Sequence, residues 1–355
     1  MSNLDTEYHS KRMSYIDMIY GSEDLLPHRY VLVLTNLCNL RCSFCFQEKK
    51  KLSGSLTLAD WKNVIDQFPD YAHVTLTGGE PFLFKGFDEI FEYITERHTC
   101  NIISNGTMLS ERLIDLLLSK ENFKILSISV DNIKNTLRDV RPEVWARTET
   151  MMQLFRAKAV ALKSKTILDA KTVVLDENTN DLFEIYRYCK EVLDVNTHSF
   201  MLLKGHGIQH SDKMHPASTM FEAAEAHQYK SPEIILTNFE KIRFYNQENC
   251  QKSYVHPKYF DLNSPKAISK KYIKFLTKSD HNPSEFMECK APWSSVHINT
   301  NGSLFPCMAI EMGNVKDETV SSIIFGESYK NFKNSIIENK TTEGCNRCGY
   351  LSPKS

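Results

Sequence analysis

Short apolar segments alternate with longer amphipathic segments between residues 30 and 203. The apolar segments have the length and β-branched content of buried strands. They lie at 30–35, 73–77, 101–104, 125–130, 166–175 and 197–203. The amphipathic segments have helical spacing and lie at 57–68, 87–97, 111–119, 143–163 and 181–193. This alternation predicts a parallel sheet covered by helices, either open or curled into a partial barrel, with ligands at the carboxyl ends of its strands.

The rest of the chain has a different pattern. The alternation stops after residue 204, and a basic, aromatic run follows at 251–280. From residue 289 the pattern predicts a hairpin over 296–306 and helices over 320–325 and 329–337. The predicted organisation is an N-terminal extension (1–27), a barrel (28–204), a helical and irregular linker (205–288) and a small C-terminal domain (289–355). We expect the linker to select the substrate.

The composition is that of an ordinary globular chain. Of the 355 residues, 41% are hydrophobic and 25% are charged, and the formal net charge is −1. A nearly neutral chain has no general attraction to nucleic acid or to an anionic membrane. No apolar run reaches the roughly 20 residues of a membrane span, and the first residues lack a signal-peptide core. We therefore expect a cytoplasmic protein with no membrane partner and no nucleic-acid partner.

Cysteine is the most informative residue type. Seven of the ten cysteines form two groups, at 38, 42 and 45 and at 289, 307, 345 and 348. In a reducing compartment, such groups bind metal or do redox chemistry more often than they form disulfides. Cys38, Cys42 and Cys45 directly follow the first predicted strand. A [4Fe–4S] cluster normally takes four thiolates, so three would leave one iron open to another ligand. A zinc site or buried thiols are the alternatives.

The CxxxCxxC spacing after the first strand, with Phe44 before the last cysteine, resembles the radical S-adenosylmethionine (SAM) superfamily. The resemblance implies a partial (β/α)6 barrel and a [4Fe–4S] cluster on Cys38, Cys42 and Cys45. It also implies that SAM binds the open iron and that a reductant such as flavodoxin or ferredoxin supplies the electron. Reductive cleavage of SAM would then give a 5′-deoxyadenosyl radical.

Polar residues at the ends of the next three strands resemble the SAM-binding motifs of that family. Gly78, Gly79, Glu80 and Pro81 resemble the GGEP motif, whose carboxylate holds the SAM amino group. By the same resemblance, the ribose and carboxylate contacts are Ser104, Asn105, Ser129 and Asp131. Arg141 resembles the arginine that pairs with the SAM carboxylate. Ser, Asn and Asp also cap loops without any ligand, which is the alternative interpretation.

The C-terminal cysteines could complete a second centre. Cys289, Cys307, Cys345 and Cys348 supply four thiolates, which suit a closed [4Fe–4S] cluster or a tetrahedral zinc site. Their order resembles the twitch domain, a shortened SPASM domain that binds one auxiliary [4Fe–4S] cluster. A cluster without an open iron can still accept an electron. That chemistry favours the oxidative modification of a small polar substrate or a ribosomal peptide.

Two other functions remain open, and no catalytic base is identified. One is a radical SAM epimerase in which a cysteine donates hydrogen to a substrate radical, with Cys250 as the candidate. The other is a non-catalytic iron–sulfur or zinc-binding interaction protein.

Overall fold

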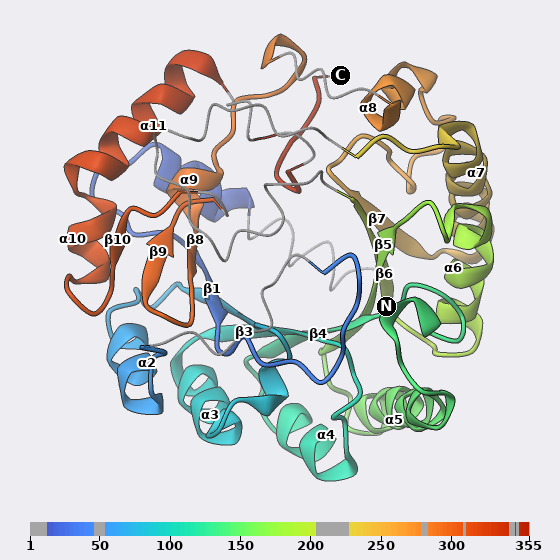
Figure 1. Ribbon diagram of the computed structural model, residues 1–355, viewed down its shortest axis with the longest axis horizontal. Helices are drawn as coiled ribbons and strands as arrows, with labels where there is room; N and C mark the ends of the chain where they lie inside the picture. The colour runs from blue at the N-terminus through green and yellow to red at the C-terminus, as the bar shows by residue number, and fades with distance from the viewer. Residues whose placement is uncertain are drawn as a thin grey trace.

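The fold is built on one mixed sheet. The computed structural model describes residues 13–45, 54–203, 227–277, 283–307, 310–340, 345 and 348–354. In these residues the strand order is β10-β9-β8-β1-β2-β3-β4-β5-β6-β7 (Figure 1). The strands are β1 (Arg29–Val33), β2 (His73–Thr77), β3 (Thr99–Ser104), β4 (Phe123–Ser129), β5 (Ile167–Val174), β6 (Thr197–Leu202), β7 (Lys252–His256), β8 (Ser295–Ile298), β9 (Ser303–Phe305) and β10 (Gly313–Asn314). Neighbours from β8 round to β7 are parallel, and β9 and β10 are antiparallel additions. The sheet curls without closing, so the predicted partial barrel is confirmed.

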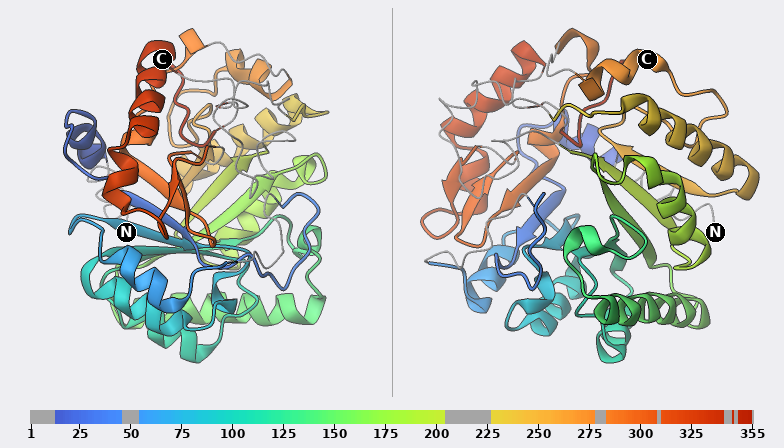
Figure 2. Two further views of the ribbon diagram at one scale, coloured as in Figure 1. Left: turned by 60° about the vertical axis from the view of Figure 1, so that its left-hand side comes forward. Right: turned by 45° about the vertical axis from the view of Figure 1, so that its right-hand side comes forward.

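The helices cover the outside of the sheet (Figures 1 and 2). They are α2 (Leu58–Ile65), α3 (Phe87–Arg97), α4 (Glu111–Leu118), α5 (Pro142–Ala161), α6 (Leu182–Glu191), α7 (Pro232–Asn249), α8 (Lys274–Thr277), α9 (Ala291–Ser294), α10 (Val320–Ile324) and α11 (Glu327–Asn339). Local signals explain where several begin. Thr57 and Asp60 form a reciprocal capping box before α2, and the Ser110 hydroxyl accepts from the Leu113 amide at the start of α4. Pro142 and Pro232 occupy the first turns of α5 and α7.

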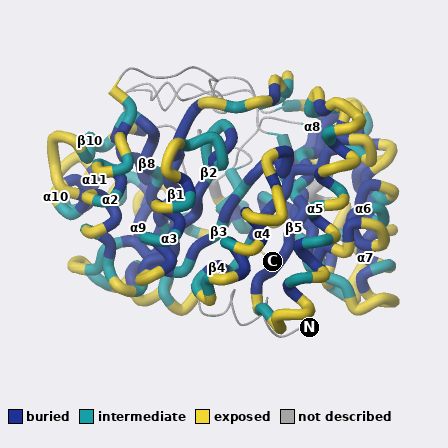
Figure 3. Tube along the Cα trace, turned by 90° about the horizontal axis from the view of Figure 1, so that it is seen from below, coloured by how far each residue is buried: buried dark blue, intermediate teal, exposed yellow. Residues whose placement is uncertain are grey.

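Alternate residues of each strand serve different faces of the sheet. On β1, Tyr30 and Leu32 are fully buried in the large core between the sheet and the helices. On the other face of β4 to β6, the Asp169 carboxylate accepts hydrogen bonds from Ser127, Thr197 and Ser199 at 3.0, 2.7 and 3.1 Å. Figure 3 shows that buried residues predominate along the strands, whereas exposed residues lie mainly on the helices and connecting loops. The interior of the barrel is therefore polar, and the main hydrophobic core lies outside it.

The two segments beyond the six-strand repeat extend the same sheet. β7 comes from the predicted linker and pairs in parallel with β6, whereas β8 comes from the predicted C-terminal domain and pairs in parallel with β1. The predicted hairpin is present as β8 and β9. The division of the chain into domains stays a prediction, and residues 204–226 of the linker lie outside the described part. Among the described residues, no helix has the length and apolarity needed to cross a membrane.

Candidate cofactor and cluster sites

The loop that carries the first three cysteines, residues 38–45 (the cluster loop), begins just after β1. The backbone of the next strand end packs tightly against its start. The Gly79 amide donates to the Thr35 carbonyl at 2.7 Å, and the Glu80 amide donates to the Leu37 carbonyl at 2.8 Å. A Cβ atom on Gly79 would lie 2.3 Å from the Leu37 oxygen, so this approach requires glycine. The Gly-Gly-Glu-Pro motif therefore helps to shape the cluster loop.

The thiols of the cluster loop are half-buried and form no disulfides. The Cys38 sulfur accepts the Leu40 amide at 3.4 Å and lies 3.8 Å from the Asn105 side-chain nitrogen. The Cys42 sulfur lies 3.7 Å from the Arg138 carbonyl oxygen and 3.9 Å from the Arg138 guanidinium. The loops after β3 and β4 thus reach two of the three thiols.

The donor set suits an iron–sulfur cluster. In the described part of the chain, no three cysteine, histidine or carboxylate side chains already converge as a metal site. The three thiols nevertheless suit an iron–sulfur cluster by their chemistry, because thiolates from one short loop are the soft ligands that such clusters require. N–H groups that point at the sulfurs of Cys38 and Cys42 would stabilise the thiolate form.

Glu80 is a fully buried carboxylate at the end of β2. One oxygen accepts the Ser104 hydroxyl at 2.9 Å and the Phe82 amide at 3.3 Å, and the other accepts the Asn105 amide at 2.8 Å. Glu80 also caps the short 3-10 helix that begins at Pro81. Burial raises the pKa of Glu80 to about 7, although these hydrogen bonds oppose the shift. A carboxylate in this state favours a cationic partner such as an ammonium group.

The loop after β3 is tied to the cluster loop by amide side chains. The side-chain amide of Asn105 donates to the Asn39 side-chain oxygen at 2.9 Å, and the side-chain amide of Asn39 donates to the Thr107 hydroxyl at 2.8 Å. Asn105 also accepts the Thr107 amide at 2.9 Å. The sequence motifs singled out Asn105 but not Asn39 or Thr107, and only their position between the cluster loop and β3 could have suggested them.

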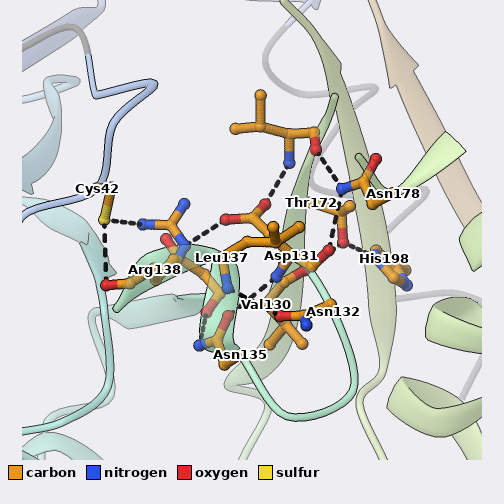
Figure 4. A network of polar contacts seen from close by, with 12 residues as sticks. Cys42, Val130, Asp131, Asn132, Asn135, Leu137, Arg138, Thr172, Asn178 and His198 are labelled. Carbon is orange, nitrogen blue, oxygen red and sulfur yellow. Dashed lines mark hydrogen bonds and ion pairs between the residues drawn. The ribbon is translucent and has the colours of Figure 1, made fainter. Parts of the chain in front are cut away.

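Asp131 and Arg138 join the end of β4 to the cluster loop (Figure 4). The fully buried Asp131 carboxylate accepts the Val173 amide at 2.6 Å and forms an ion pair with the Arg138 guanidinium. Burial raises the pKa of Asp131 and the arginine opposes that shift. The guanidinium also lies 5.3 Å from the centre of the Phe44 ring. Asp131 is thus part of a network within the protein that ends at Cys42.

The structure separates the two arginines that follow β4. The Arg141 side chain is 77% exposed and pairs with Glu143 at 3.2 Å. A 3-10 turn, Thr136–Arg138, lies between β4 and α5, and the flanking residues Asn135 and Asp139 adopt left-handed backbone. This turn directs Arg138 toward the cluster loop. Ser129 is buried, and its backbone carbonyl accepts a hydrogen bond from the side-chain amide of Asn135 at 3.1 Å.

The second group of thiols is drawn from two packing regions. Cys289 and Cys307 pack against a cluster that includes Trp293 and Phe332. Cys345 and Cys348 pack against a different cluster beside β5 to β7. Burial raises the pKa of Cys289, and the neighbouring Cys345 and Cys348 raise it further. Three of the four thiols are therefore close enough to interact electrostatically, and four thiolates suit a closed iron–sulfur or zinc centre.

The remaining cysteines are placed elsewhere. Cys100 on β3 and Cys189 on α6 are fully buried, and burial raises the pKa of both thiols. Cys250 is exposed at the C-terminal end of α7, just before β7 begins. It therefore lies at the amino ends of the parallel strands, whereas the cluster loop lies at their carboxyl ends.

Comparison with known protein families gives two matches. The model of the radical SAM superfamily matches residues 32–212, and the model of an iron–sulfur cluster-binding domain, SPASM, matches residues 289–349. The first match covers the cluster loop and all the strand ends described above. The second match includes all four C-terminal cysteines.

Two curated relatives come from Bacillus subtilis (strain 168). The sporulation killing factor maturation protein SkfB is 30% identical over 176 residues, which is 48% of this chain and 42% of SkfB. The antilisterial bacteriocin subtilosin biosynthesis protein AlbA is 23% identical over 188 residues, which is 51% of this chain and 40% of AlbA. The matched part therefore spans less than half of either relative.

Solved structures share the fold at low identity. Streptococcus suis SuiB bound to the precursor peptide SuiA superposes with a TM-score of 0.62 and 14% identity, covering 92% of this chain and 71% of SuiB. Native anSMEcpe with bound AdoMet and Cp18Cys peptide gives a TM-score of 0.59 and 15% identity, covering 92% of this chain and 88% of the other. At these identities the likeness concerns the fold alone.

Proposed function

The chain belongs to the radical SAM superfamily, and from this premise we propose that it oxidatively modifies a ribosomal peptide. Membership implies SAM and [4Fe–4S] clusters as cofactors. The observation that carries the proposal is the convergence of the cluster loop, Glu80 and Asn105 at one edge of the sheet. The strand ends there provide thiolates for a cluster and a carboxylate for an ammonium group.

Each part of this edge has a separate task in the proposal. Cys38, Cys42 and Cys45 would hold the cluster, and Glu80 would accept hydrogen bonds from the SAM amino group. When bound, these cofactors supply a 5′-deoxyadenosyl radical, which removes a hydrogen atom from the substrate. Ser104 and the Asn105 amide fix the orientation of the Glu80 carboxylate. Ser129 and Arg141 stay predicted SAM contacts, and Arg138 is added to them because it lies beside Cys42.

The choice of a peptide rests on the relatives. SkfB is named for the maturation of a killing factor and AlbA for subtilosin biosynthesis, and SuiB and anSMEcpe have each been solved with a peptide. The polar interior of the barrel, with Asp169 and its hydroxyl partners, would also accept a small polar substrate. After the hydrogen atom has been removed, the substrate radical must still lose a proton and an electron to give an oxidised product. A four-thiolate auxiliary cluster would be the electron acceptor.

The position of Cys250 argues against the epimerase alternative. A hydrogen donor must reach the substrate radical near the cluster loop, but Cys250 lies at the opposite end of the parallel strands. Uptake of deuterium from heavy water into the product would favour the epimerase. An oxidised product without deuterium favours the proposal.

The first experiment compares the wild type with a variant in which Cys38, Cys42 and Cys45 are all Ala. After anaerobic reconstitution, we expect about eight irons per chain in the wild type and about four in the variant. We also expect reduced wild type to form 5′-deoxyadenosine from SAM and the variant to form none. A candidate peptide would then lose a hydrogen pair, which mass spectrometry detects.

Two results would overturn parts of the proposal. About four irons falling to none, together with bound zinc, would make the C-terminal centre structural and remove the electron acceptor. A reconstituted wild type that forms no 5′-deoxyadenosine would favour a non-catalytic iron–sulfur or zinc-binding protein instead.

A further inference from the structure

The last described residues, 348–354 (the tail), lie where the sheet fails to close. Figure 1 shows the tail in red between β7 on one side and β8 on the other. Its backbone bonds to two segments near β7. The Lys258 amide donates to the Leu351 carbonyl at 3.3 Å, and the Met287 amide donates to the Ser352 carbonyl at 2.8 Å. The Lys354 amide donates to the Glu285 carbonyl at 2.9 Å. The tail is therefore fastened to the β7 side of the opening.

One side chain of the tail reaches the opposite side. The Tyr350 hydroxyl accepts from the Arg29 guanidinium at 2.6 Å and donates to the Ser295 hydroxyl at 2.8 Å. Arg29 begins β1 and Ser295 begins β8, and the two residues are directly paired in the sheet. Arg29 is itself oriented by the Thr75 hydroxyl at 3.3 Å. Tyr350 thus links the tail to β1 and β8 through two hydrogen bonds, one of them charge-assisted.

The four C-terminal thiols are divided in the same way. Cys345 and Cys348 pack on the cluster beside β5 to β7, which includes Phe200 and Val255. Cys289 and Cys307 pack on the separate cluster around Trp293. A tetrahedral centre needs all four sulfurs within coordination distance of its metal, so both pairs must be held in fixed relation. Tyr350 follows Cys348 by two residues, and its side chain joins the tail to the β8 side.

We propose that Tyr350 is a positioning residue for the auxiliary centre. It anchors the tail, which begins at the ligand residue Cys348, to β1 and β8, so that the formed centre fastens together the two sides of the open barrel. The inference rests on the four-thiol centre of the proposed function. It requires neither radical chemistry nor a particular metal.

The test uses the variant with Cys38, Cys42 and Cys45 changed to Ala, in which only the auxiliary centre can load. Tyr350→Phe is added to this background, and the rate at which a chelator removes the metal from the folded chain is measured. We expect loss about tenfold faster, because the variant loses the charge-assisted hydrogen bond to Arg29, and a bond of this kind is worth about a factor of ten in an equilibrium constant. The matched control is Tyr93→Phe, which removes a hydroxyl contact to Asp66 on the outer surface. It should lose metal at the parent rate.

A second measurement separates positioning from general destabilisation. Hydrogen exchange should quicken at the amides of Lys258 and Met287, which bond to the tail, and stay unchanged at Gly79 in the cluster loop contact. Ser295→Ala removes one partner of Tyr350 and should give a smaller change in the same direction. If Tyr350→Phe fails to fold, this milder variant carries the test.

Equal metal loss from the Tyr350→Phe and Tyr93→Phe chains would overturn the inference. So would equal acceleration of exchange at Gly79, which would indicate loss of the whole fold. Failure of the radical chemistry is a separate result, because it would appear as missing 5′-deoxyadenosine in the wild type while the metal measurement remained unaffected.

Discussion

The two groups of thiols are held in different ways. The first group lies in one short loop, whose surroundings are the adjoining ends of β1 to β4. Its supports, such as Gly79 and Asn105, reach it directly. The second group is assembled from two separate packing clusters, with the tail between them. A site on one edge of a sheet can be formed before any cofactor binds, whereas a site across an opening depends on what closes that opening.

The largest loss of stability is expected for a variant that disrupts the surroundings of the first group of thiols and leaves the second group unchanged. Asp131→Ala would leave the largely buried Arg138 without its partner and the Val173 amide without its acceptor. Loss of one partner from a buried pair costs about 4 kcal/mol. Urea unfolding should show this loss, and metal retention at the C-terminal thiols of the folded chain should be unchanged.

The control for that variant is Glu143→Ala. It also removes a carboxylate paired with an arginine, but both side chains are largely exposed. Surface pairs contribute little to stability, so no measurable change is expected. Equal losses from the two variants would contradict the role of burial in the Asp131 pair.

The next effect compares one glycine from each region. Gly79→Ala forces a Cβ against the Leu37 carbonyl, and this backbone contact has little room to relax. We expect a loss of about 3 kcal/mol in the free energy of unfolding. The first centre should also fail to retain iron.

Gly349→Ala is the matched change in the tail. Its Cβ would meet His256 and Met201 at 3.8 and 3.9 Å, which is ordinary van der Waals contact. Thermal unfolding should shift little. A large loss at Gly349 would mean that the tail is packed as tightly as the cluster loop, and the contrast between the regions would fail.

A pH series sharpens the description of the first site. The pKa of Glu80 is raised by burial from 4.5 to about 7 in the folded chain, so the folded state binds the proton more tightly. The contribution of Glu80 to stability is therefore greatest below pH 4.5 and falls as the pH rises toward 7. Relative to Glu80→Gln, the wild type should lose about 2–3 kcal/mol across that window, measured by urea unfolding without SAM. Parallel profiles would contradict the raised pKa, because they require Glu80 to have the same pKa in the folded and unfolded chains.

The smallest effect concerns Arg141. Because its side chain is exposed, Arg141→Ala should change the free energy of unfolding by less than about 0.5 kcal/mol. Its predicted contact with SAM is tested separately, by calorimetric titration of Arg138→Ala and Arg141→Ala with SAM. We expect the larger loss of affinity at Arg138. A larger loss at Arg141 would support the assignment made from spacing.

The sequence predicted the local features of this molecule well. β2 and α3 have their predicted boundaries, and the other predicted elements up to β6 differ by at most a few residues. Periodicity and caps are properties of neighbouring residues, so they can be read along the chain. The Gly-Gly-Glu-Pro motif was also predicted correctly at the carboxyl ends of the strands, because it directly follows a segment with a clear strand pattern.

The features that were not predicted depend on contacts between distant segments. β7 comes from a stretch with a basic, aromatic composition, which gave no indication that it would pair with β6. Two left-handed residues beside Thr136–Arg138 decide which arginine faces the cluster loop, and spacing does not encode that turn. The contact between Tyr350 and Arg29 joins residues from nearly opposite parts of the chain, which no local pattern reveals.

The pairing of β1 with β8 imposes an order on biosynthesis. As the nascent chain leaves the ribosome, β1 pairs with β2 early, but its other edge has no strand until β8 has been made. An unpaired edge strand invites association with other chains. Pairing across such a long interval also slows folding. Expression of this protein should therefore benefit from chaperones that cover this edge of β1 until β8 has emerged and pairs with it.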